Sequence, residues 1–191
     1  MGFIWTDIMS IPHRNDNITL KDDFKFLNNV DNWTSHRIFL LLALELTREG
    51  AVLELGCGNG STPFLKNYCD ANKRNLYSYD FDKNWADKFG AISINNNWEE
   101  SDYCDRNYSV ALIDESPGRH RGISIKNLMN KVDIFVAHDT EPESDCGYNM
   151  SSAWLLFKYI SHYKKFKAQA TIFSNKYDIT KYRSINDISI N

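Results

Sequence analysis

Apolar and polar positions along the chain follow two periods, and these periods predict most of its secondary structure. Apolar residues recur at helical spacing from residue 34 to 49, with Thr34 or Ser35 as the N-cap and Gly50 as the terminator. Short apolar runs follow, most of them separated by helical patterns. We expect strands at 51–55, 75–79, 91–94, 108–113, 132–137, 168–173 and 184–190, and helices at 63–71, 84–89, 123–130 and 151–163.

This order of elements predicts the fold class. Strands that alternate with helices form right-handed βαβ units and a parallel sheet. We therefore expect an α/β, doubly wound fold with a mostly parallel seven-stranded sheet, an antiparallel carboxyl-terminal strand and helices on both faces. The chain shows no repeat and no interdomain linker, so residues 1–191 are interpreted as one domain.

Residues 1–33 precede the predicted core of residues 34–191 and have no clear period. We interpret them as an irregular arm with one short helix near 22–27. The arm is rich in aromatic residues, which suit either a substrate lid or a surface for a protein partner. These aromatic residues are Phe3, Trp5, Phe24, Phe26 and Trp33.

Composition narrows the range of partners. Twenty-two Lys and Arg against 25 Asp and Glu give a net charge of −3, which argues against unselective binding of nucleic acid. The longest apolar run, 38–44, is far shorter than the roughly 20 residues of a membrane-spanning helix, and no leader pattern precedes it. The four cysteines are scattered without a Cys-x-x-Cys pair, which favours a reducing compartment. We expect a cytoplasmic protein that does not bind membranes.

A glycine-rich loop follows the first predicted strand. Residues 56–63 read Gly-Cys-Gly-Asn-Gly-Ser-Thr-Pro, and the alternating glycines let a ligand approach the backbone closely. Ser61 or Thr62 can cap the next helix, Pro63 suits its first position, and the free amides at that end favour an anion or nucleotide. The third glycine comes one residue earlier than in the dinucleotide-binding fingerprint, which argues against a site for a nicotinamide dinucleotide.

The stretch Val-Leu-Glu-Leu-Gly-Cys-Gly-Asn-Gly at 52–60 resembles motif I of class I S-adenosylmethionine-dependent methyltransferases. The resemblance implies a Rossmann-like domain that binds S-adenosylmethionine. Asp80 ends the second strand, where an acid accepts both ribose hydroxyls, with Asp82 as the fallback. Asn97 and Trp98 fall where this family usually holds adenine. The implied cofactor-binding residues are Glu54, Gly56, Cys57, Gly58, Asn59, Gly60, Ser61, Asp80, Phe81, Asn97, Trp98 and Asp114.

The ends of the fourth and fifth strands carry the candidate catalytic residues Asp114, His138 and Asp139. They resemble a subset of small-molecule O-methyltransferases with His-Asp-Thr after the fifth strand. In related metal-dependent enzymes, acids at these strand ends hold a divalent cation, so Asp114 and Asp139 are candidate ligands of Mg²⁺ or Mn²⁺. His138 departs from that acidic pair and is an alternative general base.

Arg119 and Arg121 follow the fourth strand. They suit a clamp for an anionic group on the acceptor, although a solvated basic loop is the simpler interpretation.

Three functions compete. The first is an O-methyltransferase of EC class 2.1.1 that acts on a small hydroxylated acceptor. The second is a non-catalytic S-adenosylmethionine-binding module that regulates or scaffolds a partner, and the third is a nicotinamide oxidoreductase. The motifs of amide, adenine and cytosine C5 methylation are missing, and RNA ribose methylation would require Lys where the chain has His138. No motif identifies the acceptor or the oligomeric state.

Overall fold

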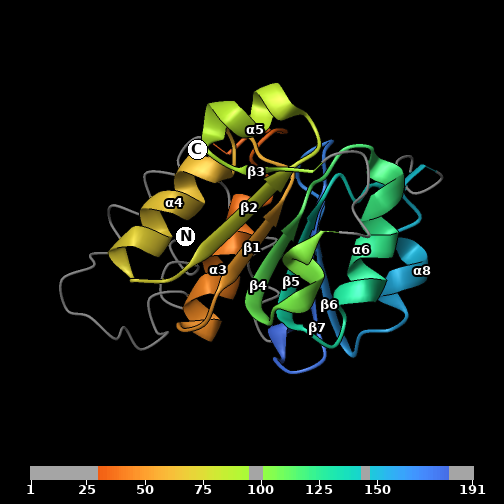
Figure 1. The fold of residues 1–191 in the computed structure, drawn as a ribbon. Coiled ribbons are helices and arrows are strands. Elements are labelled where there is room, and N and C mark those ends of the chain that lie inside the picture. The colour runs from red at the N-terminus through yellow and green to blue at the C-terminus, as the bar shows by residue number, and fades with distance from the viewer. Residues whose placement is uncertain (1–29, 95–100, 143–146, 181–191) are drawn as a thin grey trace.

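The computed structural model describes residues 30–94, 101–142 and 147–180, whose strands form one twisted sheet (Figure 1). The strand order is β3-β2-β1-β4-β5-β7-β6. Strands β1 to β5 pair in parallel, whereas β7 runs antiparallel to both β5 and β6. The predicted doubly wound α/β fold is therefore confirmed. The strands are β1 (Val52–Leu55), β2 (Leu76–Asp80), β3 (Ile92–Ser93), β4 (Tyr108–Ile113), β5 (Val132–His138), β6 (Tyr159–Tyr163) and β7 (Ala170–Ser174).

Helices cover both faces of the sheet, with α3 and α4 on one side and α6 and α8 on the other (Figure 1). Successive side chains of a strand point to opposite faces, so Val110 and Leu112 of β4 join the core beneath α3 and α4. Ala111 and Ile113 join the second core beneath α6. Burial on both faces explains why these strands are continuous apolar runs. The helices are α3 (Arg37–Thr47), α4 (Thr62–Ala71), α5 (Lys83–Phe89), α6 (Arg121–Leu128) and α8 (Ser151–Trp154).

Helix α3 is shorter than predicted at both ends. It begins at Arg37, because the Thr34 hydroxyl donates to the carboxylate of Asp31 and forms a separate turn before the helix. At the other end, Arg48 adopts the left-handed conformation with φ +53° and donates its N–H to the Leu44 carbonyl. The predicted terminator Gly50 therefore lies beyond the true end of the helix.

The predicted helix over residues 151–163 is wrong. Helix α8 ends at Trp154, and Tyr159–Tyr163 form the edge strand β6. The sequence Tyr-Ile-Ser-His-Tyr contains two tyrosines and one β-branched residue, which favour strands, and pairing with β7 buries Ser161 and Tyr163. The predicted strand at 168–173 corresponds to β7. The predicted strand at 184–190 and the short helix near 22–27 lie outside the described residues.

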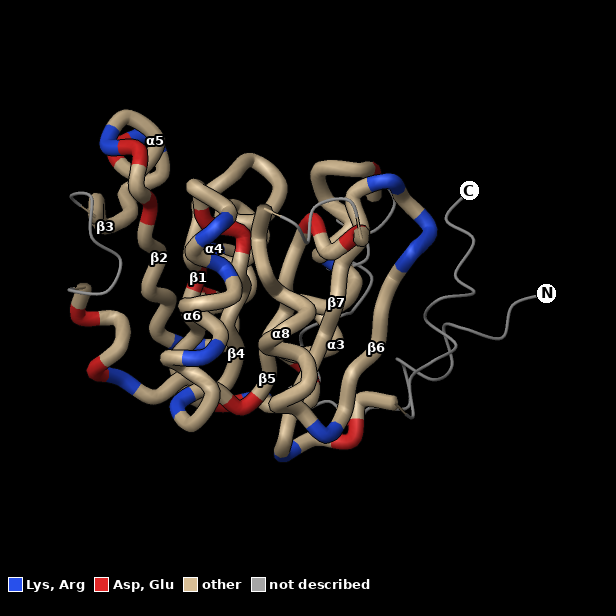
Figure 2. The backbone as a smooth tube through the Cα atoms, turned by 90° about the vertical axis from the view of Figure 1, so that its right-hand side faces the viewer, with Lys and Arg blue, Asp and Glu red and all other residues tan. Residues whose placement is uncertain are grey.

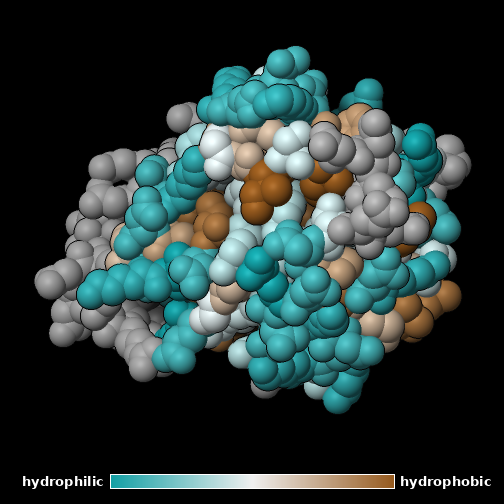
Figure 3. All heavy atoms as spheres, in the orientation of Figure 1, coloured by the Kyte–Doolittle hydropathy of each residue, from teal (hydrophilic) through white to brown (hydrophobic). Residues whose placement is uncertain are grey.

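Charged residues lie mainly in helices and in the loops at strand ends, while the central strands carry few charges (Figure 2). The face seen in Figure 3 is largely hydrophilic, with apolar side chains near β3. Ile92 of β3 and the neighbouring Phe81 are indeed exposed. Among the residues that the structure describes, no helix is both long enough and apolar enough to cross a membrane.

A buried arginine lies at the amino-terminal ends of the central strands β1 and β4, at the opposite end of β1 from the glycine-rich loop. Arg74 follows α4, and its guanidinium donates to the backbone carbonyls of Leu44, Glu49 and Gly50. It also donates to the Ser109 hydroxyl at 2.5 Å. The planar guanidinium therefore joins the end of α3 to the start of β4.

We predict that Arg74→Lys lowers the free energy of unfolding by about 1–3 kcal/mol, because one ammonium group cannot reach all of these buried acceptors. Urea denaturation measures the loss. The control is Arg106→Lys, since Arg106 forms an exposed ion pair with Asp102 and its replacement should leave the free energy of unfolding nearly unchanged. Equal losses in the two variants would contradict this role of Arg74.

Candidate active site

The glycine-rich loop leaves β1 at Gly56, and its three glycines serve different purposes. Gly56 has φ +89°, and a Cβ there would overlap the backbone of Asp114 at the end of β4. A Cβ on Gly60 would lie 2.6 Å from the Trp33 carbonyl oxygen. A Cβ on Gly58 would meet nothing closer than 3.8 Å. The fold therefore requires glycine at 56 and 60, whereas Gly58 only leaves room beside the loop.

Glu54 supports this loop from inside the protein. Its buried carboxylate accepts hydrogen bonds from the hydroxyls of Ser61 at 2.6 Å, Thr62 at 2.9 Å and Ser78 at 2.6 Å. Neither Ser61 nor Thr62 therefore caps α4 in the expected way, although Thr62 accepts the N–H of Gly58. Burial raises the pKa of Glu54 to about 7, and the three hydroxyls partly oppose this effect.

Asp80 fixes the other side of the loop. Its carboxylate accepts the N–H of Cys57 at 2.7 Å and that of Asp82 at 2.8 Å, and its burial raises its pKa. The Trp85 ring N–H on α5 donates to the Cys57 carbonyl. The sequence analysis did not identify Trp85 as a site residue, because the pattern there predicted a helix at 84–89 and nothing more. Asn97 and Trp98 lie outside the described residues.

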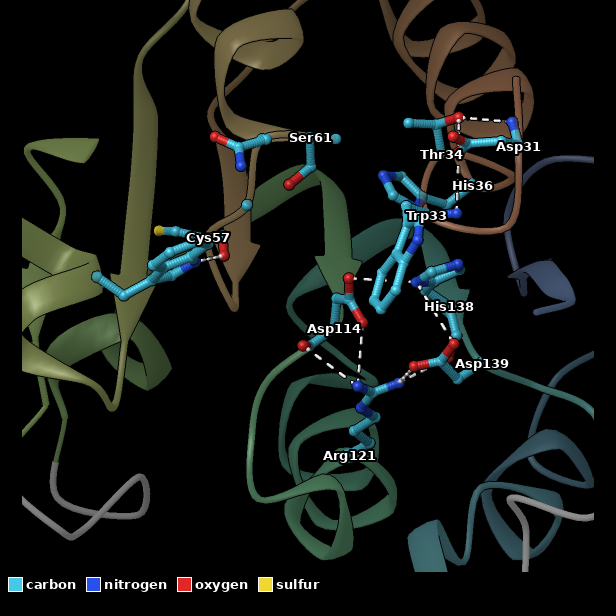
Figure 4. Close-up of a pocket in the computed structure, with 14 residues that line it drawn as sticks. Asp31, Trp33, Thr34, His36, Cys57, Ser61, Asp114, Arg121, His138 and Asp139 are labelled. Atoms are coloured by element: carbon cyan, nitrogen blue, oxygen red, sulfur yellow. Dashed lines mark hydrogen bonds and ion pairs between the residues drawn. The ribbon is translucent and has the colours of Figure 1, made fainter. Parts of the chain in front are cut away.

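A pocket of about 680 Å³ connects the loop with the ends of β4 and β5 (Figure 4). Of the predicted site residues, Glu54, Gly56, Asp80 and Phe81 do not line it. The lining residues that the sequence analysis proposed for the site are Cys57, Gly58, Asn59, Gly60, Ser61, Asp114, His138 and Asp139. The others are Asp31, Trp33, Thr34, His36, Trp85 and Arg121.

Arg121 lies between the two candidate catalytic carboxylates. Its guanidinium is 3.0 Å from Asp114 Oδ1 and 3.2 Å from Asp139 Oδ2. It is only 5% exposed, so its interpretation as part of a solvated loop is wrong, whereas Arg119 is exposed as expected. Burial opposes the charge of Asp114, but the positive partners His138 and Arg121 outweigh it and hold the pKa of Asp114 at about 2.

His138 has a hydrogen-bond acceptor at each ring nitrogen. Nδ1 lies 3.3 Å from Asp114 Oδ2, and Nε2 lies 3.0 Å from the Asn32 carbonyl oxygen. Burial lowers the pKa of His138, but the Asp114 carboxylate more than compensates and the net pKa is raised. An imidazole satisfies both acceptors only if it carries two protons, or if another cation replaces one of them.

His36 is a pocket residue that the sequence analysis missed. It is 1% exposed, and neither ring nitrogen has a hydrogen-bond partner among the residues that the structure describes. Its ring meets that of His138 edge-on, with centroids 4.6 Å apart. Burial, followed by the charge of His138, lowers the pKa of His36 to about 3, so the ring is neutral. In the sequence, His36 lies at the start of a predicted helix, where nothing marks it as a site residue.

Comparisons with solved structures show which known proteins have a similar fold. No protein-family model and no curated protein matches the sequence. The methyltransferase domain of METTL16 is a similar solved structure, with 10% identity, a TM-score of 0.52, and 90% of this chain and 89% of that chain covered. The plantazolicin methyltransferase BpumL in complex with S-adenosylhomocysteine has 12% identity, a TM-score of 0.52 and 91% and 94% coverage.

A third similar structure is the Podospora anserina methyltransferase PaMTH1 bound to S-adenosylhomocysteine, with 11% identity, a TM-score of 0.51 and 88% and 92% coverage. At such low identity these similarities concern the fold, which is that of the class I methyltransferases. The predicted Rossmann-like architecture is thereby confirmed.

We predict that Gly58→Ala folds normally and loses affinity for S-adenosylhomocysteine by at least about tenfold, because its methyl group has space in the protein but projects where a ligand approaches. Calorimetric titration measures the affinity and thermal melting checks the fold. Gly147→Ala is the matched control, since a Cβ there has space as well, with no described atom within 4 Å, and Gly147 does not line the pocket. Unchanged affinity in Gly58→Ala would exclude close approach of the ligand at this glycine.

The raised pKa of Glu54 predicts a pH dependence of stability. As pH rises above the usual carboxyl pKa of 4.5, the unfolded chain releases the Glu54 proton, while the folded protein retains it up to about pH 7. The free energy of unfolding therefore falls between pH 5 and 7, by up to about 1.4 kcal/mol per pH unit from this group. Glu54→Gln should make this fall shallower in denaturation curves.

Exposed Asp87 forms a surface ion pair with Lys83, so Asp87→Asn serves as the control and should keep the wild-type slope. Buried Glu115 also has a pKa raised to about 7 and accounts for a remaining slope in Glu54→Gln. Identical slopes in the wild type and Glu54→Gln would refute the assignment to Glu54.

Proposed function

We propose that the chain is an S-adenosylmethionine-dependent methyltransferase that methylates a hydroxyl group of a small acceptor. One observation carries the proposal: a single pocket joins the glycine-rich loop to the Asp114, His138 and Asp139 side chains. In-line methyl transfer requires the donor and the acceptor oxygen within about 3 Å of each other, in a place that excludes water. The similar fold of two structures that contain S-adenosylhomocysteine supports the choice of donor.

The donor end of the pocket is built from the loop and α5. The methionine part of the donor would lie along Gly58 to Ser61, which line the pocket. Asp80 and Phe81 do not line the pocket, although Asp80 accepts the N–H of the lining residue Cys57. Asp80 would accept the ribose hydroxyls with lone pairs not used by Cys57 and Asp82, and Phe81 would contact the adenosine. The resemblance assigns the adenine ring to Asn97 and Trp98.

At the acceptor end, the hydroxyl proton must leave before or as the oxygen attacks. The oxygen then forms a bond to the methyl carbon, the carbon–sulfur bond breaks, and neutral S-adenosylhomocysteine remains. His138 takes the proton directly if one of its nitrogens is unprotonated, and Asp114 stabilises the resulting imidazolium at 3.3 Å. Arg121 helps to lower the pKa of Asp114 and holds the carboxylates of Asp114 and Asp139 in place.

The alternative route uses a divalent cation between Asp114 and Asp139. These two carboxylates do not form an open pair, because the Arg121 guanidinium contacts both of them. A cation at that position would have to displace a buried guanidinium that also donates to the Glu115 and His138 carbonyls. The carboxylates of Asp114 and Asp139 therefore do not suit a shared Mg²⁺ or Mn²⁺ ion.

The acceptor is proposed to be small. The pocket volume of about 680 Å³ falls within the range of about 300–1,000 Å³ for small-molecule sites. Asp31, Trp33 and Thr34 form one wall, and Trp33 is 80% exposed there. These residues belong to the predicted arm or directly follow it. Their place in the pocket lining fits a role of residues 30–34 in acceptor binding better than a role as a surface for a protein partner.

We predict that Asp139→Asn lowers methyl transfer at least about 100-fold, because the negative charge of Asp139 and the orientation of the neighbouring side chains are lost. The variant should retain binding of S-adenosylhomocysteine. Transfer is followed with methyl-labelled S-adenosylmethionine and a panel of phenols, catechols and sugars. Asp133→Asn is the matched control on the same strand, since Asp133 pairs with Lys176 outside the pocket. It should retain full activity.

Two outcomes would overturn the proposed function, and a third would overturn the role of Asp139. Binding of S-adenosylhomocysteine without transfer to any acceptor would favour the regulatory or scaffolding module. Binding of NADH instead of S-adenosylhomocysteine would favour an oxidoreductase. A loss of folding and binding together in Asp139→Asn would make this residue structural.

A further inference from the structure

We propose that His36, Asp114 and His138 form a binding site for a divalent transition-metal ion at the acceptor end of the pocket. The three residues each offer one ligand atom, and these atoms all lie within 4.8 Å of one another. They come from the segment before α3, the end of β4 and the end of β5. The role of the ion in methylation rests on the proposed function, whereas its binding does not.

The surroundings of His138 are those of a metal ligand. In metal sites, one imidazole nitrogen usually donates its N–H to a backbone carbonyl or carboxylate, which orients the other nitrogen toward the ion. Nε2 of His138 lies 3.0 Å from the Asn32 carbonyl and fits the donating role. Nδ1 then presents its lone pair toward Asp114 Oδ2 at 3.3 Å. Two acceptors face each other there, and a cation between them removes the repulsion.

The second observation that supports a metal site concerns His36 and does not depend on the surroundings of His138. It is 1% exposed, it lines the pocket, and within the described part of the chain both of its ring nitrogens lack a hydrogen-bond partner. A buried polar group without a hydrogen-bond partner destabilises the folded state, so a neutral imidazole in this position calls for a ligand. The ring lies edge-on to that of His138 at 4.6 Å, which brings the two imidazoles to the same point of the pocket.

Asp114 divides its two carboxylate oxygens between different partners. Oδ1 pairs with Arg121 at 3.0 Å, and Oδ2 faces His138. Oδ2 is therefore the oxygen available to an ion. Asp139 instead holds Arg121 and acts as a positioning residue for this arrangement, since it does not belong to the cluster of close ligand atoms.

The donor set defines the class of ion. Two imidazole nitrogens and one carboxylate oxygen suit Zn²⁺, Mn²⁺, Co²⁺ or Fe²⁺, whereas Mg²⁺ prefers oxygen ligands alone. Bonds of about 2.0–2.2 Å place ligand atoms at most about 4.4 Å apart, so small side-chain rotations complete the site. Three protein ligands leave a position for the acceptor hydroxyl, whose pKa a bound cation lowers.

The test is metal binding by the full-length protein after removal of metals with a chelator. Zn²⁺ and Mg²⁺ are titrated by calorimetry, and Co²⁺ is titrated by visible absorption, because its spectrum reports coordination by nitrogen and oxygen. We expect one Zn²⁺ or Co²⁺ per chain and no binding of Mg²⁺ at the same concentrations. His36→Gln should weaken Zn²⁺ binding by at least about 100-fold, since it removes a ligand.

His162→Gln is the matched control, because His162 pairs with Thr171 at the edge strand and lies outside the cluster. It should bind Zn²⁺ like the wild type. If His36→Gln fails to fold in a thermal melt, Asp114→Asn replaces it with the same expected loss. Absence of Zn²⁺ and Co²⁺ binding, or unchanged binding in both ligand variants, would overturn the site.

Titration of S-adenosylhomocysteine into the metal-free and the Zn²⁺-loaded protein separates this inference from the proposed function. Metal binding that depends on His36, without any binding of S-adenosylhomocysteine, supports the metal site and refutes the methyltransferase. Methyl transfer at the full rate in the chelated protein supports the methyltransferase and overturns the role of the metal.

Discussion

One buried guanidinium holds the chemical end of this molecule together. Arg121 donates to the backbone carbonyls of Asp114, Glu115 and His138 and to the carboxylates of Asp114 and Asp139. The ends of β4 and β5 are thereby fixed to the first turn of α6. A charged group buried at this depth persists only when its partners are in place. The positions of Asp114 and His138 depend on this contact.

The donor end depends on a different constraint, the close approach of two parallel strands. Gly56 at the end of β1 packs against the backbone of Asp114 at the end of β4, and no side chain fits between them. The loop that follows is fixed by Glu54 on one side and by Asp80 on the other. Since β1 and β4 are neighbours in the sheet, the loop and Asp114 open into the same pocket. Ligands of open α/β sheets bind at such a crevice.

Much of this arrangement follows from sequence patterns that are local. The apolar runs of β1, β4 and β5 and the glycine-rich loop are continuous in sequence, and the residues that end each strand face the crevice because parallel strands end at one edge. Asp114, His138 and Asp139 therefore came together as expected. Helical and strand periods are harder to separate in short aromatic stretches, which is why β6 was mistaken for part of a helix.

The residues missed in the sequence analysis depend on contacts between distant parts of the chain. His36 meets His138 across 102 positions of the sequence, and no spacing rule connects them. Arg121 looked like part of a basic loop, since its partners lie in two different strand ends. Trp85 reaches the glycine-rich loop only through the folding of α5 beside it. Such contacts become visible only when the sheet is assembled.

A crystal structure of the protein with S-adenosylhomocysteine bound would test the central claim most directly. The account predicts that the ligand lies along the glycine-rich loop, with its ribose at Asp80 and its sulfur directed at the space between Asp114 and His138. Binding elsewhere, or with the sulfur directed away from these side chains, would contradict a single pocket shared by donor and acceptor.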